Sequence, residues 1–155
     1  MTDLSYGQKK KVILSFGLAT NCKLLIMDEP TNGLDIPSKG QFRKILAGSI
    51  TDDQTYIIST HQVKDLTHLI DAIIILENSE IVFHEHIGQI MEKLQFGVVQ
   101  GMHAPDNVFY SERVPGGYVV VKENSDGVET EVEMEALFNA VTQNKTAIQE
   151  LFKNK

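Results

Sequence analysis

The chain has 155 residues, of which 42% are hydrophobic and 23% are charged, as in ordinary globular proteins. Its formal net charge of -7 argues against a general nucleic-acid binder, because affinity for a phosphate backbone comes mainly from clustered Lys and Arg. The single Cys22 excludes an internal disulfide. The longest purely apolar run, residues 72–76, is far short of the roughly 20 residues that cross a bilayer, so we expect any membrane role to come through a partner.

A helix is predicted close to the start of the chain. Ser5 and Gln8 have the spacing of a capping box, in which each side chain bonds the backbone N–H of the other residue. The apolar residues that recur with helical period, and that predict a buried face, are Val12, Phe16 and Ala19. The basic run Lys9–Lys11 on the same helix favours a solvated face.

A strand, a helix and a second strand follow. Residues 24–27 are apolar at every position, which is typical of a strand buried on both faces of a parallel sheet. Pro37 suits the first position of a helix that runs to about Ile50. Residues 55–59 predict the second strand. Strand, helix and strand in this order predict a right-handed crossover between parallel strands.

The remaining elements are shorter. We expect a helix over about residues 62–69, a hairpin of strands 73–77 and 81–83 around Asn78–Ser79, and a short helix over about 86–95. After Phe96 the elements expected are a turn at Pro115–Gly117, a strand over 118–121, and a helix from about Glu133 that breaks near Asn144. Residues 97–155 are therefore predicted to form a small α+β appendage.

Two adjacent carboxylates end the first strand. Asp28 and Glu29 should point in opposite directions, because side chains alternate along a strand, and so have different roles. One carboxylate suits the shell of Mg²⁺, which takes few carboxylates and keeps its waters. The other suits the orientation or deprotonation of an attacking water. For this pair alone, a solvated strand end is the ordinary alternative.

Two more features point to the same chemistry. His61 follows the second strand, and ligands of parallel sheets bind at the carboxyl ends of strands, so His61 should lie at the same edge as the acidic pair. Ser5 and Gly7 begin the first helix, where free N–H groups and the helix dipole favour an anion such as phosphate. Taken alone, Ser5 is simply a helix cap.

Together these segments resemble the nucleotide-binding domain of the ABC ATPase superfamily. Residues 4–8 look like its signature motif, residues 24–29 like its Walker B strand, and residues 32–35 like its D-loop, while His61 stands at the place of the switch histidine. The resemblance implies an α/β fold: the C-terminal half of a P-loop (RecA-like) ABC ATPase domain, with parallel strands and crossover helices, over residues 1–96. The accessory α+β region would occupy residues 97–155.

The resemblance also implies roles for single residues. Glu29 would be the catalytic base, His61 would contact the γ-phosphate, and Asp28 would support the Mg²⁺ shell. In this family ATP lies between two head-to-tail subunits, and the signature helix acts on the nucleotide of the opposite subunit. The residues implied to bind ATP or to signal across that interface are Ser5, Gly7, Gln8 and Asp35.

Two departures from the family pattern matter. Tyr6 replaces the first glycine of the signature motif, and because Gly7 is retained we expect a tolerated variant. These 155 residues contain neither a G-x-x-x-x-G-K-[ST] phosphate-binding loop nor a Q-loop before the signature motif. We therefore expect a C-terminal fragment of an ATPase that by itself binds ATP poorly and hydrolyses it negligibly.

The function expected of the parent protein is that of an ATP-hydrolysing subunit of an ABC transporter. Residues 32–35, and the hairpin over 73–83 with the short helix after it, resemble transporter ATPases more than the ribosome-associated branch of the superfamily. Among transporters, we favour an export system. The implied cofactors are ATP and Mg²⁺, and the implied partners are a second ATPase subunit and transmembrane permease subunits, with no nucleic acid. This places the protein in the cytoplasm, at the inner face of the cell membrane. The alternatives are a dimerisation or regulatory module without ATPase activity, or a soluble ABC ATPase outside transport.

Overall fold

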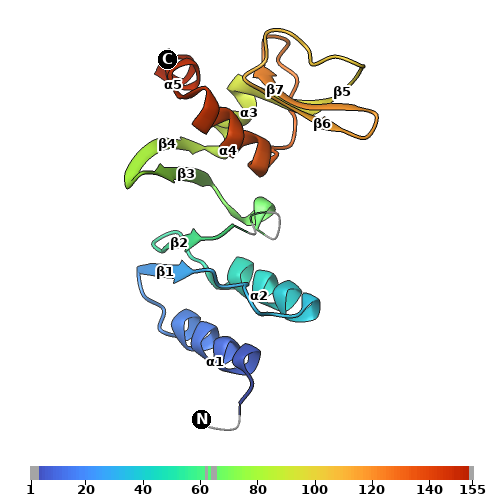
Figure 1. Ribbon diagram of the computed structural model, residues 1–155. Helices are drawn as coiled ribbons and strands as arrows, with labels where there is room; N and C mark the ends of the chain where they lie inside the picture. Colours follow the sequence, from blue (N-terminus) through green and yellow to red (C-terminus); the bar gives the residue numbers. More distant parts are fainter. Residues whose placement is uncertain (1–3, 62, 64–65, 154–155) are drawn as a thin grey trace. The chain divides into compact units, whose positions relative to one another are not determined.

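The computed structural model describes residues 4–61, 63 and 66–153, and the chain divides into two compact units, Met1–Leu69 and Ile70–Lys155 (Figure 1). Each unit is described by itself below. Within the described residues, no helix has both the length and the apolar character needed to cross a membrane.

The first unit carries the predicted crossover. Its elements are the helices α1 (Tyr6–Ala19) and α2 (Ile36–Ser49), the strands β1 (Leu24–Asp28) and β2 (Thr55–Ser59), and the 3₁₀ turn η2 (Thr67–Leu69). β1 and β2 pair in parallel, with Asp28 opposite Ser59 at their carboxyl ends. The parallel pair and the helix between its strands are therefore confirmed. Of the helix expected over residues 62–69, the structure describes η2, and residues 62, 64 and 65 lie outside the described part.

Side-chain caps begin both helices of this unit. Gln8 N donates to Ser5 Oγ at 3.3 Å, and Ser5 N donates to Gln8 Oε1 at 2.8 Å, so the predicted capping box is present. α2 begins at Ile36, one residue before the predicted start. Asp35 is its cap and accepts from Ser38 N at 2.8 Å, which leaves Pro37 in the first turn, where its missing N–H is not needed.

The predicted burial of α1 and β1 is wrong. α1 has no buried residue, and the Phe16 side chain is 72% exposed. On β1 only Met27 is buried, and Ile26 is 67% exposed. Periodicity shows which residues share an apolar face, but burial requires an element packed against that face. In the described chain β1 pairs only with β2. The buried hydrophobic side chains of this unit are Met27, Leu34, Phe42, Leu46 and Leu66.

The second unit begins with the predicted hairpin and a short helix. Its first elements are β3 (Ala72–Glu77), β4 (Glu80–His86) and α3 (Ile87–Lys93). β3 and β4 are antiparallel, and Asn78 and Ser79 turn the chain with positive φ angles of 49° and 66°. Asn is one of the few residues other than Gly that tolerate this left-handed backbone. The turn predicted at Asn78–Ser79 is therefore present for a local reason.

A three-stranded sheet and two helices complete the second unit. They are β5 (Leu94–Gln100), β6 (Tyr110–Val114), β7 (Gly117–Glu123), α4 (Met134–Gln143) and α5 (Lys145–Lys153), with sheet order β5-β7-β6. The turn before Gly117 is present, with φ 91° at Gly116, and the helix breaks at Asn144 as predicted. The α+β character expected of this region is confirmed.

The hairpin and the C-terminal helices share one core. Gln149 Nε2 donates to Val82 O at 3.1 Å, and the rings of Phe83 and Phe152 meet edge to face with centroids 5.1 Å apart. The largest fully buried side chains of this unit are Ile90, Leu94, Val121, Leu137, Val141 and Ile148. The second compact unit therefore begins at Ile70. The predicted end of the ATPase-like segment at residue 96 stays a prediction.

Candidate functional site

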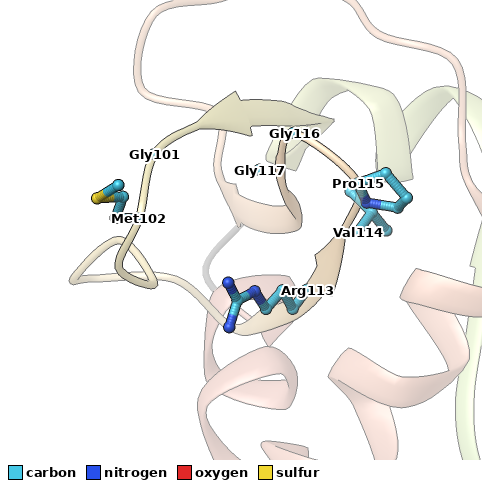
Figure 2. Close-up of a pocket in the computed structure, with 7 residues that line it drawn as sticks. All are labelled: Gly101, Met102, Arg113, Val114, Pro115, Gly116 and Gly117. Atoms are coloured by element: carbon cyan, nitrogen blue, oxygen red, sulfur yellow. The ribbon is translucent and has the colours of Figure 1, made fainter.

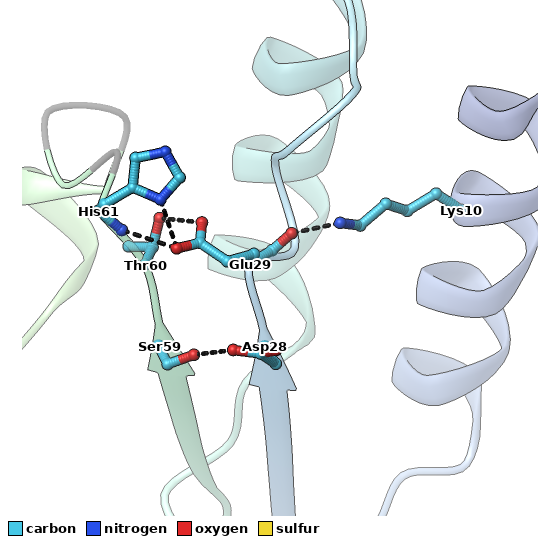
Figure 3. A network of polar contacts seen from close by, with 6 residues as sticks. All are labelled: Lys10, Asp28, Glu29, Ser59, Thr60 and His61. Atoms are coloured by element: carbon cyan, nitrogen blue, oxygen red, sulfur yellow. Dashed lines mark hydrogen bonds and ion pairs between the residues drawn. The ribbon is translucent and has the colours of Figure 1, made fainter.

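The two adjacent carboxylates lie at the carboxyl end of β1. Asp28 is the last residue of the strand, and Glu29 N donates to Ser59 O of β2 at 2.8 Å. Glu29 has a positive φ of 44°, which is uncommon for a residue with a side chain. The two carboxylates have different partners, as expected: Asp28 Oδ1 accepts from Ser59 Oγ, whereas Glu29 reaches the residues after β2 (Figure 3).

Glu29 and His61 meet at the end of the sheet. His61 Nδ1 lies 2.5 Å from Glu29 Oε1, and His61 N donates to the same oxygen at 3.0 Å. Thr60 Oγ1 donates to Glu29 Oε2 at 3.0 Å. Residues more than thirty positions apart are thus joined because β1 and β2 end together, as the sequence predicted for His61. The sequence analysis did not identify Thr60 as a partner of Glu29. Its position between the end of β2 and His61 could have indicated that it lies at the same edge of the sheet.

The contacts of Glu29 favour its ionised form. Desolvation by burial raises the pKa of Glu29, but the hydrogen bonds from His61 and Thr60 outweigh it and hold this pKa below its ordinary value. The Glu29 side chain is 27% exposed and that of His61 is 69% exposed. A carboxylate that is ionised, oriented by three donors and open to water has the features of a general base.

Lys10 is a contact that sequence reasoning missed. Its Nζ donates to the backbone oxygen of Glu29, and the residue is half-buried rather than solvated (Figure 3). The solvated face expected for Lys9–Lys11 is therefore wrong at Lys10. A run of three lysines on a helix carries no local signal that one of them reaches a carbonyl nineteen residues further on.

The start of α1 lies against the loop over residues 32–35. A β-carbon built on Gly7 would stand 3.2 Å from Gly33 O, so the two backbones pass close to each other. Ser5 and Gln8 are occupied with the capping box at this point. The three residues implied to bind ATP from the signature motif therefore lie together at one exposed helix end, and their role toward nucleotide stays a prediction.

Asp35 has a local structural role. Its carboxylate accepts from Ser38 N and caps α2. The hydrogen bonds from Ser38 lower the pKa of Asp35, and the charge of Lys11 adds to this effect. The role of Asp35 across a subunit interface is not tested by these contacts and stays a prediction.

The oxygen atoms near Asp28 fit a Mg²⁺ ion. Within the described ranges, no group of three or more His, Cys, Asp and Glu side chains is placed to hold a metal ion. Mg²⁺ does not require such a cage, because it is commonly bound by one or two carboxylates together with waters and substrate phosphates. The Asp28 carboxylate and the Ser59 hydroxyl supply hard oxygen donors of this kind.

Pockets lie in each unit. A groove of about 460 Å³ between α1 and β1 is lined by Tyr6, Lys9, Lys10, Ile13, Leu14, Gly17 and residues 25–28, which include Asp28. In the second unit, a pocket of about 670 Å³ is formed by residues 101–102 and 113–117, with Arg113 as its charged side chain (Figure 2). None of the predicted site residues lines this second pocket, so its greater volume carries no weight for ATP chemistry.

The chain has relatives among curated transport proteins, although no family model matches it. It is 32% identical over 87 residues to the cobalt import ATP-binding protein CbiO of Salmonella paratyphi A. This match covers 56% of this chain and 32% of that protein. It is 32% identical over 82 residues to the Nod factor export ATP-binding protein I of Neorhizobium galegae, 53% of this chain and 24% of that protein. It is 28% identical over 141 residues to the uncharacterized ABC transporter ATP-binding protein MJ1023 of Methanocaldococcus jannaschii, 88% of this chain and 52% of that protein.

The curated homologues are ABC transporter ATP-binding proteins, of both import and export types. The matches cover about half or less of the length of each relative. This partial coverage, with the mixed α/β structure and its parallel strand pair, is consistent with part of an ABC ATPase domain. The resemblance inferred from the motifs is thereby confirmed.

Proposed function

We propose that this chain supplies the hydrolysis side of an ATP site in an ABC-type transport ATPase. The observation that carries the proposal is the contact between Glu29 Oε1 and His61 Nδ1, 2.5 Å apart at the carboxyl edge of β1 and β2. A carboxylate held by an imidazole at the end of parallel strands is the arrangement needed to activate water beside a phosphoryl group.

Glu29 accepts a proton from the attacking water in this proposal. The hydrogen bonds from Thr60 and His61 fix the direction of its carboxylate and keep it ionised. His61 is the more exposed partner and contacts the γ-phosphate with its free ring nitrogen. Asp28 and Ser59 would hold Mg²⁺, which when bound offsets the charge of the phosphates.

The start of α1 provides the second half of the proposal. Ser5, Gly7 and Gln8 stand at a capped and exposed helix N-terminus, where N–H groups and the helix dipole favour a phosphate. We assign this end to the γ-phosphate held by a second, head-to-tail ATPase subunit, and Asp35 to communication across that interface. The transport partner is a transmembrane permease, which places the chain at the inner, cytoplasmic face of the membrane.

The proposal is limited to part of the reaction. The phosphate-binding loop of the family does not occur in these 155 residues, so this chain is assigned the water-activating and γ-phosphate contacts only. By itself it is expected to hydrolyse ATP negligibly. Residues 32–35 and the β3–β4 hairpin support a transport ATPase rather than a soluble one. We favour export as the direction of transport, although relatives of both directions exist.

The test is turnover by the complete gene product. Glu29→Gln should suppress steady-state ATP hydrolysis strongly, while the affinity for ATP, measured by equilibrium binding, stays unchanged, because only the water-activating step is removed. Glu92→Gln, on α3 of the other unit, is a matched control that should leave turnover as it was. Undiminished turnover in Glu29→Gln would overturn the role given to this residue.

One observation favours a dimerisation or regulatory module as the second candidate. Ile13, Phe16 and Ile26 are exposed apolar side chains on α1 and β1, where an isolated soluble unit would gain by covering them. Sedimentation of the 155-residue chain without nucleotide decides between the two. A stable dimer that forms without ATP and does not change with ATP favours the module, whereas a monomer favours the ATPase assignment.

A further inference from the structure

We infer that Lys10 is a positioning residue for Glu29: it holds the backbone of Glu29 in its left-handed conformation and so ties α1 to the water-activating carboxylate. The inference rests on the proposed function of Glu29. It adds a residue that neither the motifs nor the relatives assign.

The backbone of Glu29 is held from both sides. Its N–H donates to Ser59 O at 2.8 Å, and its oxygen accepts from Lys10 Nζ. The same oxygen accepts from Asn32 N at 3.2 Å, which closes the turn after β1. The two peptide groups that flank the α-carbon of Glu29 are therefore held by β2 through Ser59, by the turn through Asn32, and by α1 through Lys10.

Such a clamp is needed because of the conformation it holds. Glu29 has φ 44°, a conformation that a residue with a β-carbon avoids unless its surroundings impose it. The side chain leaves from the same α-carbon, so a return of φ to negative values swings the carboxylate away from Thr60 and His61. The direction of the carboxylate is thus set by the backbone contacts as well as by its own hydrogen bonds.

Lys10 differs from its two neighbours in the basic run. Lys9 is exposed, and Lys11 lies where its charge lowers the pKa of Asp35, whereas Lys10 is half-buried and reaches Glu29. α1 has no buried residue, so a polar contact such as that of Lys10 adds to the few apolar contacts that join α1 to β1 and the turn after it. A cation on the carbonyl oxygen also makes a stronger hydrogen bond than a neutral donor.

The first test measures the clamp in the 155-residue chain, without nucleotide. Amide hydrogen exchange is followed at Glu29 and Asn32 in Lys10→Met, Lys10→Arg and Lys9→Met. Lys10→Met should speed exchange at both amides about tenfold, since a hydrogen bond from a charged donor is lost. Lys10→Arg should restore slow exchange, and Lys9→Met should leave it within about twofold. Exchange in α2 shows that the unit is still folded.

The second test separates positioning from structure by kinetics of the complete gene product. Lys10→Met should lower kcat about tenfold or more with KM for ATP unchanged, because the carboxylate is misplaced while nucleotide binding is intact. Lys10→Arg should recover most of kcat. If Lys10→Met has normal kcat while the separate variant Glu29→Gln is inactive, the inference about Lys10 is overturned and the proposed function of Glu29 stands.

The two failures are distinguishable. If Glu29→Gln retains turnover, the proposed function fails, and the exchange experiment still decides whether Lys10 holds the backbone of Glu29. If exchange at Glu29 and Asn32 is the same in Lys10→Met as in Lys9→Met, the clamp does not exist and the inference fails whatever the kinetics show.

Discussion

The ring of Tyr6 occupies the space that a side chain at Gly33 would need. A β-carbon built on Gly33 would stand 2.6 Å from Cε1 of that ring, and Gly33 has a positive φ of 76°. Tyr6 is the residue that departs from the glycine of the family motif, and Gly33 belongs to the loop over 32–35 that resembles the D-loop. The residue that departs from the signature motif, Tyr6, therefore contacts the segment that resembles the D-loop.

Gly33→Ala should destabilise the first unit by about 1–2 kcal/mol, because a side chain is disfavoured at this φ and must also displace the Tyr6 ring. Urea unfolding measures the change. Adding Tyr6→Ala should recover only the steric part, since the strain of the left-handed backbone remains. Gly48→Ala, at a helical glycine with nothing within 4 Å, is the control and should be neutral or stabilising. Equal effects of Gly33→Ala and Gly48→Ala would contradict the prediction.

The capping box of α1 gives a second prediction. Ser5→Ala removes the oxygen that accepts from Gln8 N and should cost about 1 kcal/mol in the free energy of unfolding. Ser15→Ala, inside the same helix and exposed, should be neutral or slightly stabilising, because Ala is the better helix former. Amide exchange at Gln8 follows the change locally, and a Gln8 amide as well protected in Ser5→Ala as in the parent would count against the cap.

The contact between Glu29 and His61 predicts a pH dependence. Desolvation raises the pKa of Glu29, but the hydrogen bonds from His61 and Thr60 lower it by more. Removing the His61 ring in His61→Ala should therefore move the pKa of Glu29 upward. The backbone N–H of residue 61 stays in place, which makes the shift partial. A ¹³C NMR titration of the carboxyl carbon measures it, with Thr60→Val as a second variant expected to shift the pKa in the same direction.

The sign of the linked stability follows from the same contacts. A carboxyl group whose pKa is lower in the folded than in the unfolded protein stabilises the fold above its unfolded pKa. That stabilisation is lost as the pH falls from the ordinary pKa of a glutamate, about 4.3, through the lower pKa of the folded protein. The parent should therefore lose more stability than His61→Ala across this range, and parallel stability curves for the two proteins would contradict the assignment.

The core of the second unit gives a fourth prediction. Ile148 is fully buried, so Ile148→Ala should destabilise this unit by about 2–5 kcal/mol through lost apolar burial and the cavity left behind. Phe138→Ala removes a larger side chain that is 49% exposed and should cost less. Because the chain forms two compact units, amide exchange in α2 should be unaffected by either change. A larger loss in Phe138→Ala than in Ile148→Ala would show that the core is assigned wrongly.

Local features of the fold were predictable because their causes lie within a few residues. The capping box at Ser5, the hairpin turn at Asn78–Ser79 and the break at Asn144 each depend on neighbours in sequence, and all three are present. The meeting of Glu29 and His61 was predictable for a related reason. Parallel strands end at one edge, so two residues that each follow a strand are brought together whatever lies between them.

Burial and the contacts between elements depend on the packing of the folded chain. The residue pattern alone was enough to locate α1, β1 and β2 and to bring Asp28, Glu29 and His61 to one edge. It did not determine that Phe16 and Ile26 are exposed, or that Lys10 reaches Glu29. The physical reason is that an apolar face or a long cation is compatible with many surroundings, and the choice among them depends on which elements pack nearby.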